Sequence, residues 1–474
     1  MREILLATTT MLASTVGYST VTIAQTVLPA PTEGVIASPL PVQAANNNNN
    51  SFVIPGDGVP KPAPGTVVIH LNGRVATGFA DSKTSLDNVS AGAPAAKLDP
   101  VSILGFVRLY PGIDAVATNG LRYGASVEIR QDFGPTAGNT SNSGGSANSF
   151  SSTLFVRRAF TYVADDRFGL IRLGQGDGPI GLFDLGVTTF QNFDTGGWDG
   201  DFSGSLPLNA NVAFPFPALQ GTEYVPAKFV YLSPKLFGFD FGFSFAPNSA
   251  ALQDLPNVNS LTSTAPTLST CAIAASGCAA LASSTVPLDG SRFRDFTETG
   301  LRYQSHIGGV GVNAFGIYAN SGHVNVSPGV AGSQFDGLSY GDMGLTFDYA
   351  GFTVGGHATT GRFNGVNALA PKGGVGGNAW LVGAQYANGP LVFGASWFDY
   401  SSQGSPLTVG IAQRREQGLA VGGTYTLAPG LSLIASYLYG TRHQGDFDFV
   451  TGKVAKTNND TRAQAFILAT VVKW

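Results

Sequence analysis

The sequence predicts an all-β protein, a transmembrane antiparallel up-and-down β-barrel of about 16 strands with long external loops. Apolar and polar residues alternate with a period of two over most of the chain after residue 66. Long and short connections alternate between these segments. The composition agrees with this fold, because charged residues make up only 12% of the chain, against about 25% in an ordinary soluble domain.

The charge and composition also exclude other classes. The 26 Lys and Arg stand against 30 Asp and Glu, which gives a net charge of −4 and no basic excess for binding nucleic acid. A hydrophobic content of 43% excludes a disordered acidic chain. Beyond the N-terminus, every run of 18 residues contains Gly, Pro or a charge, which argues against helical membrane spans.

The N-terminal residues 1–24 have the pattern of a secretory signal peptide, with Arg2, an apolar stretch and a small-residue cleavage site before Gln25. Residues 25–65 are rich in Pro and contain five consecutive Asn, a composition typical of an unfolded periplasmic tail or linker. This segment could serve as a spacer or bind peptidoglycan. We expect the barrel to occupy residues 66–474.

Export places the chain in an oxidising compartment. The only two cysteines, Cys271 and Cys278, lie close together in a stretch rich in Ala, Ser and Thr. We expect a local disulfide between them, because a structural metal site needs about four ligands.

Several segments show the alternation clearly. In the stretch FGFDFGFSF the odd positions from Phe237 to Phe245 are all Phe, while Gly, Asp and Ser occupy the even positions. Successive side chains of a strand point to opposite faces, so each such strand has one apolar and one polar face. The same pattern predicts sixteen strands, at 66–80, 101–110, 121–132, 152–163, 168–175, 222–233, 237–246, 294–304, 309–319, 340–350, 351–361, 378–387, 390–400, 416–427, 431–442 and 462–474.

The parity of the connections separates a membrane barrel from a soluble sandwich. Short turns such as 164–167, 388–389 and 428–430 alternate with loops of roughly 14 to 47 residues. Outer-membrane barrels have short periplasmic turns and long external loops, whereas a sandwich has no reason to sort its loops in this way. Barrels of about sixteen strands also enclose a water-filled lumen.

Three features together resemble the Gram-negative general porin family. Residues 157–177 resemble its strand, turn and strand before the third loop, residues 228–245 resemble the pair after that loop, and the chain ends on the aromatic Trp474. The resemblance implies a homotrimeric outer-membrane channel for passive diffusion of small hydrophilic solutes and ions, surrounded by outer-membrane lipid and lipopolysaccharide. It also implies that Trp474 is read by the outer-membrane assembly machinery. The tail at 25–65 and a terminal Trp in place of Phe depart from the family.

The alternation also predicts which charges face the lumen. Arginine on the lipid face costs about 2–4 kcal/mol at the membrane midplane, so we expect the cations of the first six strands to point inward. Arg157 and Arg158 are adjacent, so only one of them, Arg157, is expected to do so. His70 and His357 also fall on lumen faces, as a polar lining. The predicted basic wall consists of Arg74, Arg108, Arg122, Arg130, Arg157, Arg172 and Lys228.

The third loop, residues 176–221, contains acidic residues and neither Lys nor Arg. In the resembled family this loop folds into the barrel and narrows it, which would set its carboxylates against the basic wall and create a transverse field. Asp194, Asp199 and Asp201 could alternatively hold Ca²⁺, although no full ligand set is evident, and no other cofactor is expected. The expected constriction carboxylates are Asp177, Asp184, Asp194, Asp199 and Asp201.

Other functions remain open at this stage. Phe190, Phe193 and Trp198 would suit a sugar-selective porin, as an aromatic track for sugars. An outer-membrane barrel enzyme would need a nucleophile, and the GLSYG stretch around Ser339 matches a nucleophile-elbow pattern. About one such match is expected by chance in a chain this rich in Gly and Ser, and Ser339 lies at the beginning of a strand. We therefore expect a channel without catalytic residues, although a barrel that mainly anchors or adheres is a further alternative.

Overall fold

The structure is a computed structural model that describes residues 21–22, 62–89, 99–132, 154–183, 197–198, 203, 205–206, 210–216, 226–248, 293–322, 335–365, 367–404 and 410–474. Within these residues the only helix is α3 (Pro179–Phe183). No helix in the described part of the chain has the length and apolar character to cross a membrane.

Sixteen long strands form one closed antiparallel barrel, which confirms the predicted fold class. They are β2 (Thr66–Thr84), β3 (Val101–Val116), β4 (Arg122–Asp132), β5 (Phe155–Asp165), β6 (Gly169–Gln175), β7 (Ala227–Leu232), β8 (Phe239–Asn248), β9 (Arg294–Ile307), β10 (Val310–Gly322), β12 (Ser339–Tyr349), β13 (Phe352–Arg362), β15 (Gly377–Asn388), β16 (Leu391–Ser402), β17 (Arg414–Ala428), β18 (Leu431–His443) and β21 (Asp460–Lys473).

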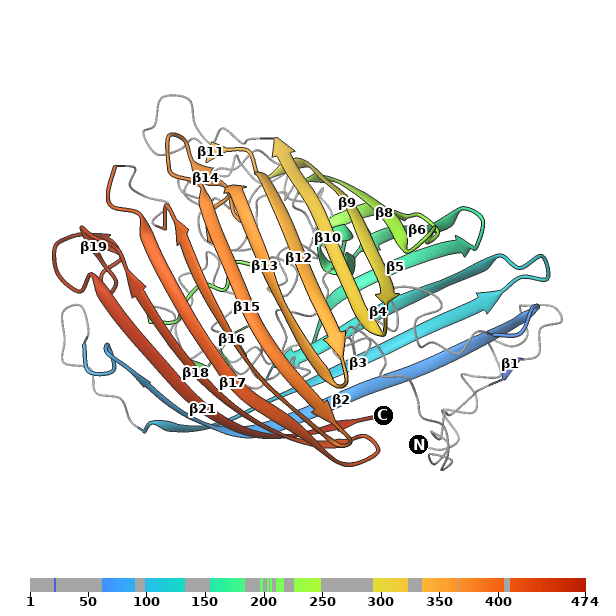
Figure 1. Cartoon of the computed structure of the whole chain (residues 1–474), viewed down its shortest axis with the longest axis horizontal. Coiled ribbons are helices and arrows are strands. Elements are labelled where there is room, and N and C mark those ends of the chain that lie inside the picture. The colour runs from blue at the N-terminus through green and yellow to red at the C-terminus, as the bar shows by residue number, and fades with distance from the viewer. Residues whose placement is uncertain are drawn as a thin grey trace, which may run out of the picture.

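Each strand pairs with its neighbour in the chain, and β21 pairs with β2 to close the cylinder, from Arg74 opposite Lys473 to Thr84 opposite Ala463. Figure 1 shows the tilted strands wrapping around the lumen. The two-residue β1 (Val21–Thr22), within the predicted signal peptide, pairs in parallel with the beginning of β2. The pairing of β21 with β2 closes the barrel, whereas the first residues of β2, 66–72, extend beyond the end of β21.

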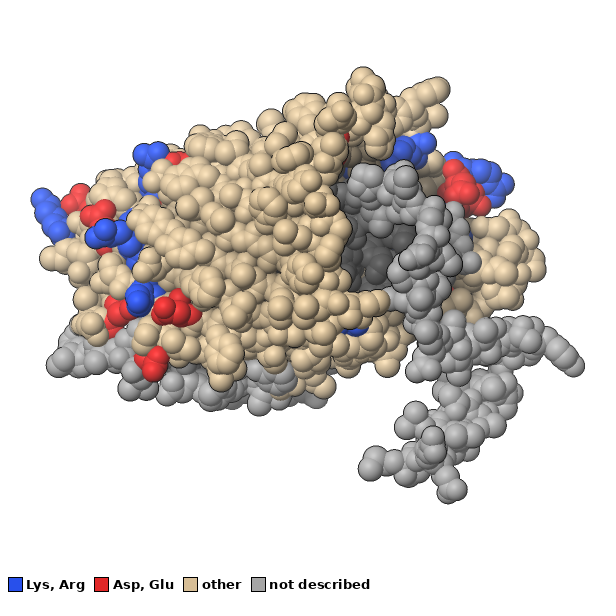
Figure 2. Space-filling view, turned by 60° about the horizontal axis from the view of Figure 1, so that its bottom comes forward, with Lys and Arg blue, Asp and Glu red and all other residues tan. Residues whose placement is uncertain are grey.

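The two faces of the wall differ in the way that the alternation predicts. Outward side chains are apolar and exposed, for example Phe79, Ile103 and Leu173, whereas inward positions are buried and include most of the charged residues of the strands. In Figure 2 the blue and red atoms gather toward the ends of the visible face and leave a broad uncharged band between them. This band is the surface that faces the hydrocarbon of the membrane.

Long loops and short turns lie at opposite ends of the barrel (Figure 1), which we name the long-loop end and the short-turn end. Several strands are longer than predicted, and the largest extension is in the second strand. The second predicted strand stopped before Pro111, but β3 continues to Val116 and the turn to β4 spans only 117–121. Proline cannot donate a ladder hydrogen bond, and the register of β3 with β4 skips from Leu109 to Gly112 at this point.

The C-terminal residue completes the seam of the barrel. The backbone N–H of Trp474 donates to the carbonyl of Gly73 at 3.1 Å, and the N–H of Gly73 donates to the carbonyl of Trp474 at 3.1 Å. The indole lies directly over Gly73, where any Cβ would collide with the ring. Trp474 therefore has a structural role at the seam, separate from the predicted assembly signal.

The loops at the long-loop end are tied to one another. The N–H of Gly404 donates to the side chain of Asn364 at 2.9 Å, and the amide of Gln444 donates to the carbonyl of Gln403 at 2.9 Å and of Ala412 at 3.0 Å. The short strand β11 (Phe335–Asp336) pairs with β14 (Ala370–Pro371). Between β18 and β21, β19 (Phe447–Asp448) pairs with β20 (Lys453–Val454) and forms the last loop.

Asp448 organises this last loop. Burial acts to raise the pKa of its carboxyl group, but hydrogen bonds outweigh burial and hold the pKa below its ordinary value. Its carboxylate accepts hydrogen bonds from the backbone N–H groups of Val450 and Thr451 and from the side chains of Thr457 and Asn458. A depressed folded-state pKa stabilises the loop above the unfolded-state value, and this stabilisation is lost as the pH falls through the folded-state pKa.

We therefore expect residues 447–459 to lose hydrogen-exchange protection selectively below about pH 4, where the unfolded carboxyl group titrates. Asp448→Asn should remove this pH dependence by loosening the loop at every pH. Exchange measured by mass spectrometry, after correction for intrinsic rates, gives the test. Equal acid sensitivity in both proteins would contradict it.

Candidate constriction of the lumen

The wall formed by β2 to β7 carries a concentration of cationic side chains on its inner face. Arg74, Arg108, Arg130, Arg172 and Lys228 are all buried and lie on the inward side of their strands. Arg122 is also on the inward side, but it lies at the short-turn end of β4, where its guanidinium pairs with Asp166 at 2.6 Å. Eight residues of strand separate it from Arg130, on the order of 26 Å, so it lies apart from the other cations of the wall.

Three of these arginines stack on phenylalanine rings of the same wall. The guanidinium carbon of Arg108 lies 4.3 Å, and that of Arg74 5.2 Å, from the ring centroid of Phe106. Arg172 lies 4.4 Å from the centroid of Phe160. Such stacking holds the planar guanidinium groups against the wall by cation–π attraction.

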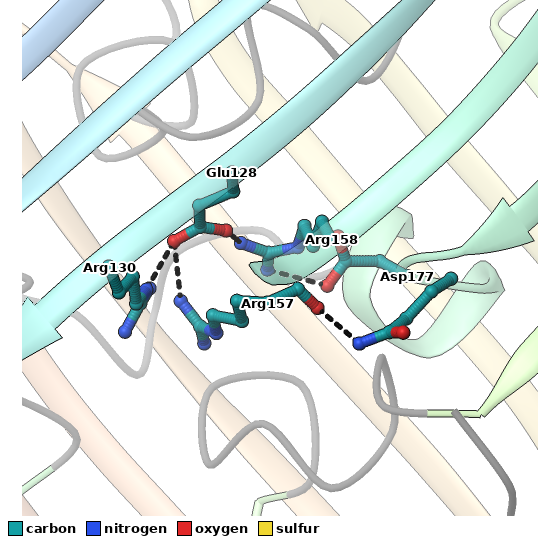
Figure 3. Close-up of polar contacts among 6 residues, drawn as sticks. Glu128, Arg130, Arg157, Arg158 and Asp177 are labelled. Atoms are coloured by element: carbon teal, nitrogen blue, oxygen red, sulfur yellow. Dashed lines mark hydrogen bonds and ion pairs between the residues drawn. The ribbon is translucent and has the colours of Figure 1, made fainter. Parts of the chain in front are cut away.

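Glu128 is the centre of an ion-pair cluster on β4 and β5, shown in Figure 3. Its carboxylate contacts Arg130, Arg157 and Arg158, the Arg157 contact being 3.2 Å. Arg158 also contacts both oxygens of Asp177 at 2.8 Å. Two carboxylates thus bind three arginines in a buried part of the wall.

The prediction that only one of Arg157 and Arg158 reaches the interior was wrong. Glu128 lies opposite Arg158 and Ile129 lies opposite Val156, so Arg157 is the extra residue of a β-bulge. A bulge interrupts the strict alternation of side chains and re-aims the one it inserts. Both arginines therefore reach the same carboxylate.

The third loop begins at Asp177 and first packs against β8 and β9. In α3, the ring of Phe183 fills a recess over Gly242 and Gly300, where side chains would contact it. The N–H of Ile180 donates to Glu298 at 3.0 Å, and Arg302 donates to the carbonyl of Leu182 at 3.2 Å. This part of the loop is held by both polar and apolar contacts.

The loop then reaches the far side of the lumen. The indole N–H of Trp198 donates to the carbonyl of Leu419 on β17 at 3.0 Å, and the N–H of Gly197 donates to Ser436 on β18 at 3.2 Å. β17 lies seven strands from β6 in one direction around the barrel and nine in the other. The described residues of the loop therefore cross the lumen, and the expected third loop inside the barrel is confirmed.

The last described residues of the loop, 210–216, pack against the inner face of β13 and β16. Phe214 packs edge-on against Phe398 of β16 with centroids 5.3 Å apart, and Phe216 lies 4.6 Å from the ring of His357 on β13. His357 in turn contacts Asp342 of β12 at 2.7 Å. His357 is thus buried under the loop instead of forming an open polar lining.

Trp198 does not serve as an exposed track for sugars, because only 4% of its surface is accessible. Its ring fills a recess over Gly418 and Gly440, where any side chain would collide with it. Phe190 and Phe193 lie outside the described residues, as do Asp184, Asp194, Asp199 and Asp201. The Ca²⁺ expectation and the Cys271–Cys278 disulfide also fall outside them.

The structure adds lumen carboxylates that the sequence prediction did not single out. Asp240 pairs with Arg302, Glu298 with Lys228, and Glu416 with Arg442. All three acids lie on the inward parity of strands beyond β7, so the alternation that identified the arginines would have identified them as well. The inner face is therefore mainly basic on β2 to β7 and gains acidic groups from β8 onward.

A closed sixteen-stranded barrel with an apolar outer band and a loop across its lumen defines an outer-membrane diffusion channel. Residues 60–445 match the family model of Gram-negative porins, and the chain belongs to that family. Its location is accordingly the outer membrane. No curated protein matches the sequence closely.

Three solved structures are matched over most of this chain. The outer-membrane protein OmpT of Vibrio cholerae is 12% identical, with a TM-score of 0.49 over 86% of this chain and 99% of that one. The anion-selective porin of Comamonas acidovorans is 13% identical, with a TM-score of 0.47 over 86% of this chain and all of that one. A mutant of the Rh. blastica porin is 11% identical, with a TM-score of 0.45 over the same share of this chain and all of that one.

Proposed function

We propose that the chain is a passive channel for small hydrophilic solutes and ions, whose selectivity is set where the third loop faces the arginines of β2 to β6. One observation supports this most directly. The loop leaves β6 and is fixed to β17 and β18 through Trp198 and Gly197, so it crosses a lumen whose wall also carries Arg74, Arg108 and Arg172. Charges that face a narrow aqueous passage act on every ion that passes it.

Neutralising Arg108 and Arg172 together, each to Gln, is expected to shift permeability toward cations. The shift should shrink as the salt rises from about 0.01 M to about 1 M, because the Debye length falls from about 30 to about 3 Å. Reversal potentials in planar bilayers under a salt gradient measure it. In the same assay, neutralising Asp194, Asp199 and Asp201 should shift permeability toward anions.

Arg122→Gln is the matched control, because Arg122 lies at the short-turn end and pairs with the exposed Asp166. It should change the reversal potential much less than the Arg108 and Arg172 double variant. An unchanged reversal potential in the double variant at low salt would remove those two arginines from the conduction path. Liposome swelling by neutral sugars separates a change of charge from a change of size.

A passive role is favoured over an enzymatic one by the surroundings of Ser339. Its hydroxyl lies 2.8 Å from the hydroxyl of Tyr318, on the outer face of the wall. A serine nucleophile needs an adjacent general base, commonly His. Family membership supports the same choice, and conductance without hydrolysis of ester or peptide substrates is the expected result.

Export and oligomerisation of the chain are the subject of two further proposals. We propose that residues 1–24 are removed on export and that the mature chain forms homotrimers among lipid and lipopolysaccharide. N-terminal sequencing should then begin at Gln25. Crosslinking in native membranes should yield trimers, and a monomer would contradict the oligomer.

Deleting Trp474 should strongly reduce insertion into the outer membrane if the assembly machinery reads the terminal aromatic residue. Gly73→Leu is the informative partner, because it displaces the indole from the seam and leaves the C-terminal residue unchanged. A low surface level for the deletion and a nearly normal level for Gly73→Leu is the expected pattern. Normal surface levels of the deletion variant would exclude a recognition role.

A further inference from the structure

Two arginines lie on the inner face of β17 and β18 near the long-loop end, apart from the arginines of β2 to β6. Gly418 and Gly440 are cross-strand neighbours, and the third loop covers them. The next inward pair toward the long-loop end is Glu416 and Arg442, and Arg414 lies beyond Glu416 on β17. Four residues of strand, on the order of 13 Å, separate Arg414 from Gly418.

The guanidinium group of Arg414 is held by two aromatic rings and one amide. Its central carbon lies 4.8 Å from the ring centroid of Phe447 and 5.1 Å from that of Phe449. Its Nε–H donates to Oε1 of Gln444 at 2.8 Å. Arg442 stacks on Phe449 as well, at 4.6 Å. The last loop therefore holds two cations close together through cation–π contacts.

The charges of this cluster do not balance. Glu416 pairs with Arg442 at 2.5 Å, whereas Arg414 forms no ion pair with any residue that the structure describes. The carboxylate of Asp448 accepts hydrogen bonds from groups of its own loop. One positive charge is thus uncompensated on a half-buried side chain. Such a position favours a bound anion, because a partly buried charge without a counter-charge is costly.

The outer edge of the Arg414 guanidinium is accessible. Its Nη1 and Nη2 atoms make no hydrogen bond within the described part of the chain, yet neither is sealed from solvent. These two nitrogens form the planar fork that binds both oxygens of one carboxylate in parallel. Because Nε is already bonded to Gln444, the orientation of this fork is fixed before a ligand arrives.

We propose that Arg414, positioned by Phe447, Phe449 and Gln444, binds the carboxylate group of a small organic acid at the outer mouth of the lumen. The long loops of an outer-membrane barrel face outward, so an acid that enters from outside reaches Arg414 before it reaches the third loop. The single excess charge of the cluster matches a single carboxylate. The inference rests on the proposed channel function and names a class of solute for it.

Chemical modification of the unaltered full chain in detergent tests the site. Phenylglyoxal reacts with accessible guanidinium groups, and mass spectrometry gives the rate at each arginine. Gluconate should slow the reaction at Arg414 at least about threefold, and glucitol, which has similar hydroxyl groups but no carboxylate, should not. Arg415 is the internal control, because its side chain is 62% exposed and pairs with Asp399. Absence of protection, or absence of any reaction at Arg414, would overturn the proposal.

Planar-bilayer recordings test whether the site lies on the conduction path. Gluconate added at the long-loop side should reduce the KCl current, and Arg414→Gln should raise the half-inhibitory concentration at least about threefold. Arg415→Gln is the matched control and should leave this concentration unchanged. Arg414→Lys keeps the charge without the planar fork, so it should restore little of the inhibition. Full restoration by Lys would show attraction by charge alone and would overturn the carboxylate site.

The results separate failure of this site from failure of the channel function. A protein that conducts, and whose reversal potential responds to the Arg108 and Arg172 double variant, but whose current is insensitive to gluconate, would overturn the carboxylate site alone. A protein that does not conduct would overturn the channel function. The modification of Arg414 in detergent needs no conductance and would still decide whether the carboxylate binds.

Discussion

Trp198→Ala is expected to raise single-channel conductance and to admit larger neutral sugars. The indole is buried in the recess over Gly418 and Gly440, and its N–H donates to Leu419. Truncating a buried Trp costs about 3–5 kcal/mol. Most of the lost free energy belongs to the contact between the third loop and β17 and β18. The loop should therefore detach from these strands while the barrel stays closed.

Trp380→Ala is the control, because Trp380 is also a tryptophan of the wall but lies on the outer face with 43% of its surface exposed. It should leave conductance and the sugar size limit unchanged. Gly440→Leu fills the recess from the other side and should reproduce the Trp198→Ala result. Unchanged conductance in both loop-releasing variants would mean that the loop does not limit the pore.

Glu128→Gln is expected to lower the free energy of unfolding by about 3–5 kcal/mol. The change leaves Arg130, Arg157 and Arg158 close together without the carboxylate that they share. Removing one partner of a buried ion pair is costly because the remaining charges stay buried without compensation. Urea titrations of the barrel in lipid vesicles measure the loss.

Asp166→Asn provides the comparison for the same type of substitution at an exposed pair. The side chain of Asp166 is 88% exposed, and exposed ion pairs contribute at most about 1 kcal/mol. The loss in free energy of unfolding is therefore expected to be several times larger for Glu128→Gln than for Asp166→Asn. If Glu128→Gln cost no more than Asp166→Asn, the cluster would not stabilise the wall.

The barrel was predictable in detail because a membrane wall imposes one rule on every residue. Each strand must place apolar side chains on lipid and polar ones inside, so all sixteen strands could be located from alternation alone. The clearest misplaced strand end is that of β3, where Pro111 sits in an irregular part of the ladder. Alternation also places Asp240, Glu298 and Glu416 on inward positions.

The arrangement inside the lumen was less predictable. The bulge at Arg157 interrupts the alternation of inward and outward side chains, and no residue type in that stretch predicts a bulge. The burial of Trp198 depends on Gly418 and Gly440, which are brought to it only by closure of the barrel. A sequence pattern describes neighbours along one strand, whereas these contacts join opposite walls.

The docking of the third loop has a consequence for the order of folding. Trp198 binds a carbonyl 221 residues later in the chain, on β17. The loop can therefore take its final position only after the C-terminal strands have formed, because the contact joins residues far apart in the sequence. A nascent barrel consequently lacks the crossing of its lumen by this loop until its last strands pair, and the passage reaches its final width at the end of assembly.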